Sequence, residues 1–525
     1  MPCRGFGCRA VLVVLVAAAM AAVTVSACDL TVELSASALA GVATYLTSAS
    51  GDVEICFDTG TYVDACATST LAVPDSVTSV VLRPSVVGAT IVVTCNTAGE
   101  SRSATGPLLT MEGSDSDSFS MTGFTFEDFG TEPGSELIVL KAKGVGFDVA
   151  LDRVELHNMA MSTTGGEACL VCLLHDDSIT LFAPTMSVVL SSFASYGHNL
   201  DDQAYVLVIG RRPGVANPFD VSVTATGVYL ADGTGAGVLI GTSHNIAMCS
   251  ATVVDFSVTN CDVSGGRSDR SQLRVQHCTA TLANAWFADN SGKYGTAIQV
   301  ESASLTGSNV GMVRNDASQH AAGLDAVSSL VSLGSGCQIV NNTGALPATG
   351  LHAADSSLIL TDTWVSGNSG NGAAVVAEST TVTLSQTTME RNSGPSGGAL
   401  RLVSTSVATV TDCYFSDNTV TGAGGAIDVQ SGSLTVVTST FERNSAGGNG
   451  GAIAAGSGAV SITGATFSAN SAASAGGCVQ IYPSATSADI VTSTFSGCSA
   501  GSNGGGIRAE LGGTSLAFVT IVDST

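Results

Sequence analysis

Residues 424–444 of this chain read GGAIDVQSGSLTVVTSTFERN, and the pattern in this stretch decides the fold. Two signals alternate in it. One is Gly-Gly-Ala followed by an aliphatic residue, and the other is Phe-x-x-Asn. Within residues 397–470 each signal returns every 26 or 27 residues. A fixed period of this length is typical of a protein built from stacked structural repeats.

The same period extends well beyond this stretch. The aliphatic position that follows the glycines is filled by Ile298, Leu324, Leu351, Val375, Leu400, Ile427, Ile453, Val479 and Ile507. The asparagine position is filled by Asn290, Asn315, Asn342, Asn368, Asn392, Asn418, Asn444 and Asn470, and then by Cys498. Two independent markers therefore keep one period over more than 200 residues.

Within one repeat the residues alternate as in β-strands. Ile427 and Val429 flank Asp428, Leu434 and Val436 flank Thr435, and glycine, serine and asparagine separate the short runs. Short strands stacked on similar neighbours predict an all-β, right-handed parallel β-helix. Each asparagine is expected to adopt a left-handed turn conformation and to join a hydrogen-bonded ladder along the stack, while the glycine pairs form tight corners.

These repeats resemble those of the polymorphic outer membrane proteins, which are defined by GGA(I/L/V) and FxxN. The resemblance covers the chain from about Gly295 to its C-terminus, and it is closest from Gly397 onward. It implies a surface-exposed β-helix that acts in adhesion.

The N-terminal part predicts export and a capped solenoid. Residues 1–27 have the basic start, apolar centre and small-residue end of a signal peptide. Cys28 follows directly, so lipidation of Cys28 is an alternative to simple cleavage. Residues 35–49 predict a short amphipathic helix that covers the open end. Residues 28–270 then form an irregular part and residues 271–525 a regular part of one continuous solenoid.

Charge and cysteine content indicate which partners, disulfides and metal sites to expect. The chain has 18 basic and 43 acidic residues, a net charge of −25, so nucleic acid is not expected as a partner. Exported cysteines predict disulfides, and spacing suggests Cys56 with Cys66 and Cys249 with Cys278. The Cys169-x-x-Cys172 pair followed by His175 lacks a second half-site, so no metal and no cofactor are predicted.

Catalytic residues are hard to find by pattern. The best candidates for catalytic residues are Asp201 and Asp202 beside His198, and His198 itself is interpreted as a surface histidine. A repeated site would place one ligand in register on successive coils. Instead, the outward position after the aliphatic residue varies, holding Arg401, Asp428, Ala454, Gln480 and Arg508.

The sequence therefore predicts a secreted or cell-surface protein, without a transmembrane segment in the mature chain. Its predicted function is that of a non-enzymatic adhesion or interaction scaffold that binds a cell-surface protein or glycan. Right-handed β-helices also include pectate lyases and polygalacturonases, so one alternative is a polysaccharide-active lyase or glycoside hydrolase with its site in residues 163–270. Another alternative is a structural element of a wall or matrix.

Overall fold

The structure is a computed structural model. It describes residues 28–33, 38–62, 70–94, 107–113, 116–131, 136–143, 146–161, 168–175, 185–200, 204–210, 220–241, 249–263, 271–293, 296–345, 347–510 and 518–522. The predicted signal peptide, residues 1–27, lies outside them.

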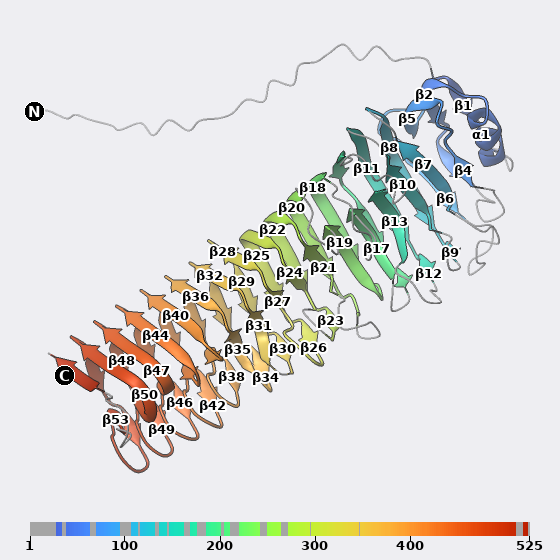
Figure 1. Cartoon of the computed structure of the whole chain (residues 1–525). Coiled ribbons are helices and arrows are strands. Elements are labelled where there is room, and N and C mark those ends of the chain that lie inside the picture. The colour runs from blue at the N-terminus through green and yellow to red at the C-terminus, as the bar shows by residue number, and fades with distance from the viewer. Residues whose placement is uncertain are drawn as a thin grey trace, which may run out of the picture.

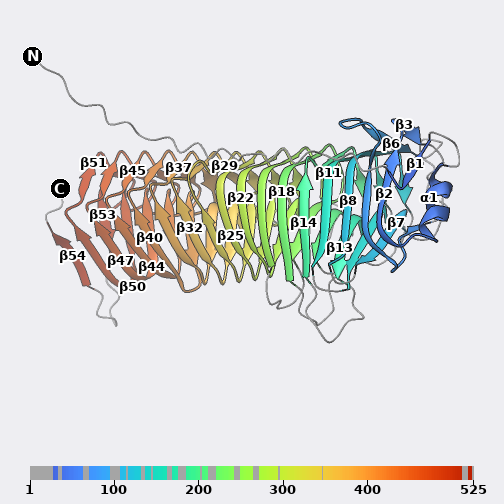
Figure 2. The ribbon, with the colours of Figure 1, turned by 90° about the horizontal axis from the view of Figure 1, so that it is seen from above.

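The described chain winds into a long rod of parallel strands (Figures 1 and 2). Helix α1 (Ala38–Leu46) lies at the N-terminal end and buries Leu39, Val42 and Leu46, as the spacing of these residues predicts. Forty-two strands join one continuous hydrogen-bonded sheet that wraps around the core. The prediction of an all-β parallel β-helix is confirmed.

One regular coil shows how the sequence makes the fold. Strands β43 (Ile427–Val429), β44 (Gly432–Val437), β45 (Thr440–Glu442) and β46 (Ser445–Ala446) follow one another around the rod. Each pairs in parallel with the equivalent strand one coil further on, in β47 (Ile453–Thr463), β48 (Thr466–Ser468) and β49 (Ser471–Ala472). Ile427 stacks on Ile453 and Phe441 on Phe467, all fully buried. Consequently a period of 26 residues places like side chains on top of one another.

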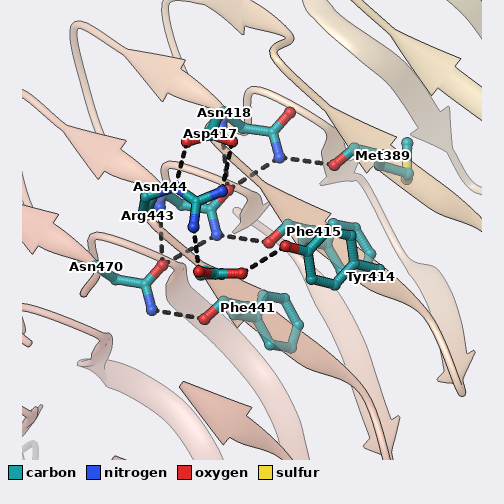
Figure 3. Close-up of polar contacts among 10 residues, drawn as sticks. Met389, Tyr414, Phe415, Asp417, Asn418, Phe441, Arg443, Asn444 and Asn470 are labelled. Atoms are coloured by element: carbon teal, nitrogen blue, oxygen red, sulfur yellow. Dashed lines mark hydrogen bonds and ion pairs between the residues drawn. The ribbon is translucent and has the colours of Figure 1, made fainter. Parts of the chain in front are cut away.

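The eight asparagines form a continuous buried ladder, of which Figure 3 shows Asn418, Asn444 and Asn470. The Nδ2 of Asn444 donates to the Phe415 carbonyl at 3.0 Å and to Oδ1 of Asn470 at 3.0 Å. Its own Oδ1 accepts from the backbone N–H and from Nδ2 of Asn418, at 3.1 and 2.9 Å. The side-chain amide thus uses its donor and acceptor capacity inside the core.

The expected left-handed conformation belongs to a different residue. In most coils the residue before the ladder asparagine has a positive φ, for example Arg443 at 52° and Asp417 at 54°. The chain turns there so that the following amide points inward. The ladder residues themselves are absent from the left-handed region, so the prediction about their backbone is wrong.

Cysteines lie at both ends of the ladder. The backbone N–H of Cys261 donates to Oδ1 of Asn290 at 3.0 Å, which starts the row. Cys498 fills the asparagine position at the other end and is bonded to Cys478, whose sulfur lies 3.3 Å from Nδ2 of Asn470. A covalent link therefore follows the last amide of the ladder.

Four disulfides are present among the described residues. Cys249 is bonded to Cys278, one coil apart. Cys56 is bonded to Cys28 instead of Cys66, which lies outside the described residues, and this bond occupies the Cys28 thiol that lipidation would need. Cys169 and Cys172 are bonded to each other, so they do not form a metal half-site. Among the described residues, no helix has the length and apolar character needed to cross a membrane.

Candidate functional site

One face of the rod is closed off by turns of the chain. We call it the turn-covered face. It is made by β21 (Leu273–Gln276), β24 (Ile298–Glu301), β27 (Leu324–Val327), β31 (Ala348–Ala354), β35 (Ala373–Glu378), β39 (Leu400–Val403) and β43. The sequence predicts a variable exterior at its outward position, but Asp428, Ala454 and Gln480 are at most 5% exposed, and only Arg401 and Arg508 of the five residues are partly exposed.

The glycine pairs explain this burial. A Cβ on Gly424 would lie 2.9 Å from the Cα of Asp428, and one on Gly476 would lie 3.0 Å from the Cα of Gln480. Because these glycines have no side chain, the turn can lie directly over the strand that follows it. Burial raises the pKa of Asp428 to about 6, against the opposing effect of Arg401.

The adjoining face is open and carries a groove. We call it the hydroxyl face. It is made by β14 (Thr185–Ser191), β18 (Asp220–Ala231), β20 (Cys249–Thr259), β22 (Thr279–Ala288) and β25 (Ser304–Val313). A groove of about 890 Å³ crosses the starts of these strands. The residues that line the groove come from several coils, so the groove forms only when the coils stack.

Hydroxyl groups line this groove in register. Ser187, Ser222, Ser250, Thr279 and Ser304 occupy one row on successive coils. Their neighbours Met186, Val221 and Cys249 point inward and are buried, because residues alternate sides along a strand. At about 4.8 Å per strand the row of five spans roughly 19 Å.

Two titratable side chains also line the groove. Asp220 and His277 directly precede Val221 and Cys278, which the register places two coils apart. Their backbones are therefore on the order of 10 Å apart. Atom Oδ1 of Asp220 is buried and has no hydrogen-bond partner in the described chain. His277 leaves β21 with a φ of 49°, and its backbone N–H donates to the Glu301 carbonyl at 3.0 Å.

A buried arginine lies just before this corner. The Nη2 of Arg274 donates to Oε2 of Glu301 at 2.9 Å, and Nη1 donates to the Tyr205 hydroxyl at 3.4 Å. Gln276 donates to the same Glu301 oxygen at 2.9 Å. Although burial alone lowers the pKa of Arg274, Tyr205 and Glu301 raise it overall. Its charge is thus neutralised inside the protein, and the lining of the groove, as far as the chain is described, contains neither lysine nor arginine.

Exposed aromatic residues form a second row on the third face. Tyr229, Trp286 and Trp364 share one outward position with Tyr414, separated by two, three and two strand steps. The first three are 38%, 39% and 41% exposed. The two tryptophans, which the sequence offers as isolated residues, are therefore aligned along the rod. Rings aligned in this way can stack on the apolar faces of sugars.

Of the residues suggested by sequence, the structure describes only His198, which does not line the groove. His198 is 1% exposed, and its Nδ1 lies 3.2 Å from the Ser195 hydroxyl. Burial lowers the pKa of His198 to about 4. The interpretation of His198 as a surface histidine is therefore wrong. Asp201 and Asp202 lie outside the described residues.

The protein is thus a parallel β-helix, and its candidate functional site is the open groove across the coils. Residues 349–521 match the family model described as right handed beta helix region, which agrees with the predicted hand of the fold. No curated protein sequence matches this chain. The resemblance of the repeats to polymorphic outer membrane proteins stays a prediction.

Several solved structures are similar to the chain at low identity. One is the A-module of a mannuronan C-5 epimerase from Azotobacter vinelandii, with 12% identity, a TM-score of 0.22, and coverage of 93% of this chain and 94% of that chain. Another is a mannuronic acid specific polysaccharide family 6 lyase from human gut microbiota, with 9% identity, a TM-score of 0.23 and coverage of 89% and 87%. A third is an α-1,3-glucanase catalytic domain, with 10% identity, a TM-score of 0.20 and coverage of 94% and 69%.

These structures correct the main functional prediction. They are enzymes that act on polysaccharides, and none of the three is an adhesion scaffold, so the predicted non-enzymatic adhesion scaffold is not carried further. The sequence argument failed because it required one ligand repeated in register, whereas a single groove needs only one acid and one base. The substrate and the acting residues have to be inferred from this chain's own side chains.

Proposed function

We propose that this protein is a polysaccharide-active enzyme that hydrolyses a neutral glycan lying along the groove of the hydroxyl face. The observation that carries this proposal is the in-register row of five hydroxyl side chains with Asp220 and His277 beside it. The groove begins at Gly146 and ends at Ser304, so it overlaps residues 163–270 and extends past them.

The hydroxyl row suits an extended sugar polymer. A serine or threonine hydroxyl both donates and accepts, as sugar hydroxyls do, so each coil can exchange hydrogen bonds with one part of a glycan. The row repeats along the rod at the strand spacing of about 4.8 Å. A polymer with a regular repeat can use several of these positions at once, whereas a small molecule cannot.

The charge of the groove favours a neutral glycan. Its described lining lacks lysine and arginine, Arg274 is paired with Glu301, and the whole chain carries a net charge of −25. An anionic uronate polymer would be repelled. Elimination from a uronate also requires a cation to stabilise its carboxylate as the C5 proton is removed, and hydrolysis of a neutral glycan has no such need.

Asp220 and His277 have the chemistry for hydrolysis. In the proposed reaction the Asp220 carboxylate takes a proton from a water molecule as the water oxygen bonds to the anomeric carbon. A protonated His277 donates a proton to the glycosidic oxygen as the bond between that oxygen and the anomeric carbon breaks. A separation on the order of 10 Å between their backbones leaves room for a sugar and a water molecule, as in enzymes that invert the anomeric centre. The disulfide between Cys249 and Cys278 fixes the coil of His277 to the one coil that lies between the two residues.

The proposed setting is extracellular. Four disulfides in the described chain are typical of a protein that folds in an oxidising compartment. Polysaccharides of cell walls and matrices are encountered in that setting.

A panel of polymers tests the function. The protein is incubated with β-1,3-glucan, α-1,3-glucan and mannan, and in parallel with alginate and polygalacturonate. New reducing ends and unsaturated uronate ends are measured separately. We expect reducing ends from at least one neutral polymer and no unsaturated ends. Unsaturated ends from alginate or polygalacturonate would contradict the proposed reaction, and no new ends from any polymer would contradict the proposed function.

A further inference from the structure

Two histidines and an aspartate meet on the turn-covered face, away from the groove. Asp325 in β27 and His352 in β31 occupy the same outward position on successive coils, and His320 lies in the turn before β27. One donor atom of each lies within 4.8 Å of the others. Oδ1 of Asp325 is 2.7 Å from Nδ1 of His352, and Oδ2 is 3.6 Å from Nδ1 of His320. The two imidazole rings are 5.3 Å apart.

Two buried atoms around this group have unmet bonding capacity. Nε2 of His352 has no hydrogen-bond partner in the described chain, and the nearest carboxylate oxygen, Oε1 of Glu378, is 3.9 Å away. Oε1 of Gln299 is also unpartnered there, and Gln299 stacks in register on Asp325. Leaving a buried polar atom unsatisfied costs about 1–3 kcal/mol, and both atoms belong to residues in contact with Asp325, so the described chain does not fully satisfy the polar groups of this cluster.

The charge of the group points to the same conclusion. The arginines of this face are engaged elsewhere, since Arg274 binds Glu301 and Arg401 lies 3.7 Å from Asp428. The carboxylates of Asp325 and Glu378 therefore face two imidazoles without a cation of their own among the described residues.

We propose that His320, Asp325 and His352 bind a divalent transition-metal ion of the zinc class. Two imidazoles and one carboxylate are typical zinc ligands, whereas calcium prefers oxygen ligands alone. Bonds of about 2.0–2.1 Å in a tetrahedral site place ligand atoms about 3.3 Å apart. The two distances from Asp325, 2.7 and 3.6 Å, bracket that value. Water would complete the shell.

The ion would join successive coils near the middle of the rod. Asp325 and His352 come from adjacent strands, so one ion would bridge successive coils as the hydrogen bonds of the asparagine ladder do. The proposal is independent of glycan hydrolysis, because none of the three ligands lines the groove.

Metal binding can be measured directly on the full chain. The protein is treated with a chelator, dialysed, and titrated with Zn²⁺ by calorimetry and with Co²⁺ by visible absorption. We expect one ion per chain and the intense bands of tetrahedral Co²⁺. His320→Ala, Asp325→Asn and His352→Gln should each weaken Zn²⁺ binding about 100-fold or more, because each removes one of the ligands.

A matched control is His157→Ala, since His157 also contacts a carboxylate, Oε2 of Glu155 at 3.0 Å, but lies far along the rod. It should bind Zn²⁺ as the unmodified protein does. Asp325 and His352 are buried, so their variants are checked for folding by circular dichroism. The side chain of His320 is 30% exposed, so the His320→Ala variant is expected to fold. Its Zn²⁺ affinity is therefore the decisive measurement. Equal Zn²⁺ affinity in His320→Ala and His157→Ala, or no binding by the unmodified chain, would overturn the proposal.

Discussion

Replacement of Asp220 by asparagine is expected to lower kcat for glycan hydrolysis about 1,000-fold, because it removes the group that takes the proton from water. Asparagine keeps the size of the side chain, and Asp220 is only half-buried, so the fold should be retained. The rate of reducing-end formation at saturating glycan gives kcat, and a thermal unfolding curve confirms that the variant is folded. His277→Gln should lower kcat to a similar extent, since it removes the proton donor.

The matched control is Asp148→Asn. Asp148 is an exposed carboxylate in the same row of the hydroxyl face, in register with Ser187 and two coils before Ser222. It does not line the groove, so its replacement should leave kcat within about twofold, an effect of less than about 0.5 kcal/mol. If Asp148→Asn and Asp220→Asn reduce kcat equally, the loss reflects surface charge and the assigned role of Asp220 is wrong.

Replacement of Asn444 by alanine is expected to lower the free energy of unfolding by about 4 kcal/mol. The change removes four buried hydrogen bonds, which join Asn444 to the backbone N–H and Nδ2 of Asn418, to the Phe415 carbonyl and to Oδ1 of Asn470. Nδ2 of Asn418 keeps its bond to the Met389 carbonyl, and Oδ1 of Asn470 keeps its bond from the backbone N–H of residue 444. Water cannot replace these bonds, because the ladder residues are at most 1% exposed. Urea unfolding followed by circular dichroism measures the effect.

Asn503→Ala is the control for the asparagine ladder. Asn503 lies in an exposed turn near the C-terminal end of the described chain and outside the ladder. Its replacement should change the free energy of unfolding by less than about 0.5 kcal/mol. A loss below about 1 kcal/mol for Asn444→Ala would show that the ladder contributes little to stability.

The fold could be predicted because its causes are local and repeated. Strand alternation at Ile427 and Val429, and the return of the same pattern in Ile453, are visible in the letters of the sequence. The asparagine ladder follows from the same period. The residue that takes the left-handed conformation could not be identified, since Arg443 and Asp417 do not share a residue type that favours it.

The groove could not be predicted, because its residues are brought into register by coils of unequal length. The steps from Ser187 to Ser222, Ser250, Thr279 and Ser304 are 35, 28, 29 and 25 residues. No fixed period connects them, so the row is visible only once the strands are stacked. Asp220 and His277 come to line the same groove for the same reason.

The proposed metal ligands escaped the sequence analysis for another reason. His352 and Asp325 are 27 residues apart, which is one coil, and neither belongs to a short metal-binding motif. The position they occupy was interpreted as variable surface. The glycine turn covers this position and buries Asp325 and His352. A charged or polar residue in a buried position points to a site, whereas the same residue on an exposed surface does not.

The most direct test of the account is a crystal structure of the Asp220→Asn variant soaked with a hexasaccharide of the neutral glycan that the protein cleaves. We predict that the sugar chain lies along the rod axis on Ser187, Ser222, Ser250, Thr279 and Ser304, with one glycosidic bond between the substituted side chain at position 220 and His277. A hexasaccharide bound elsewhere on the rod, with the groove filled by water alone, would contradict the central claim.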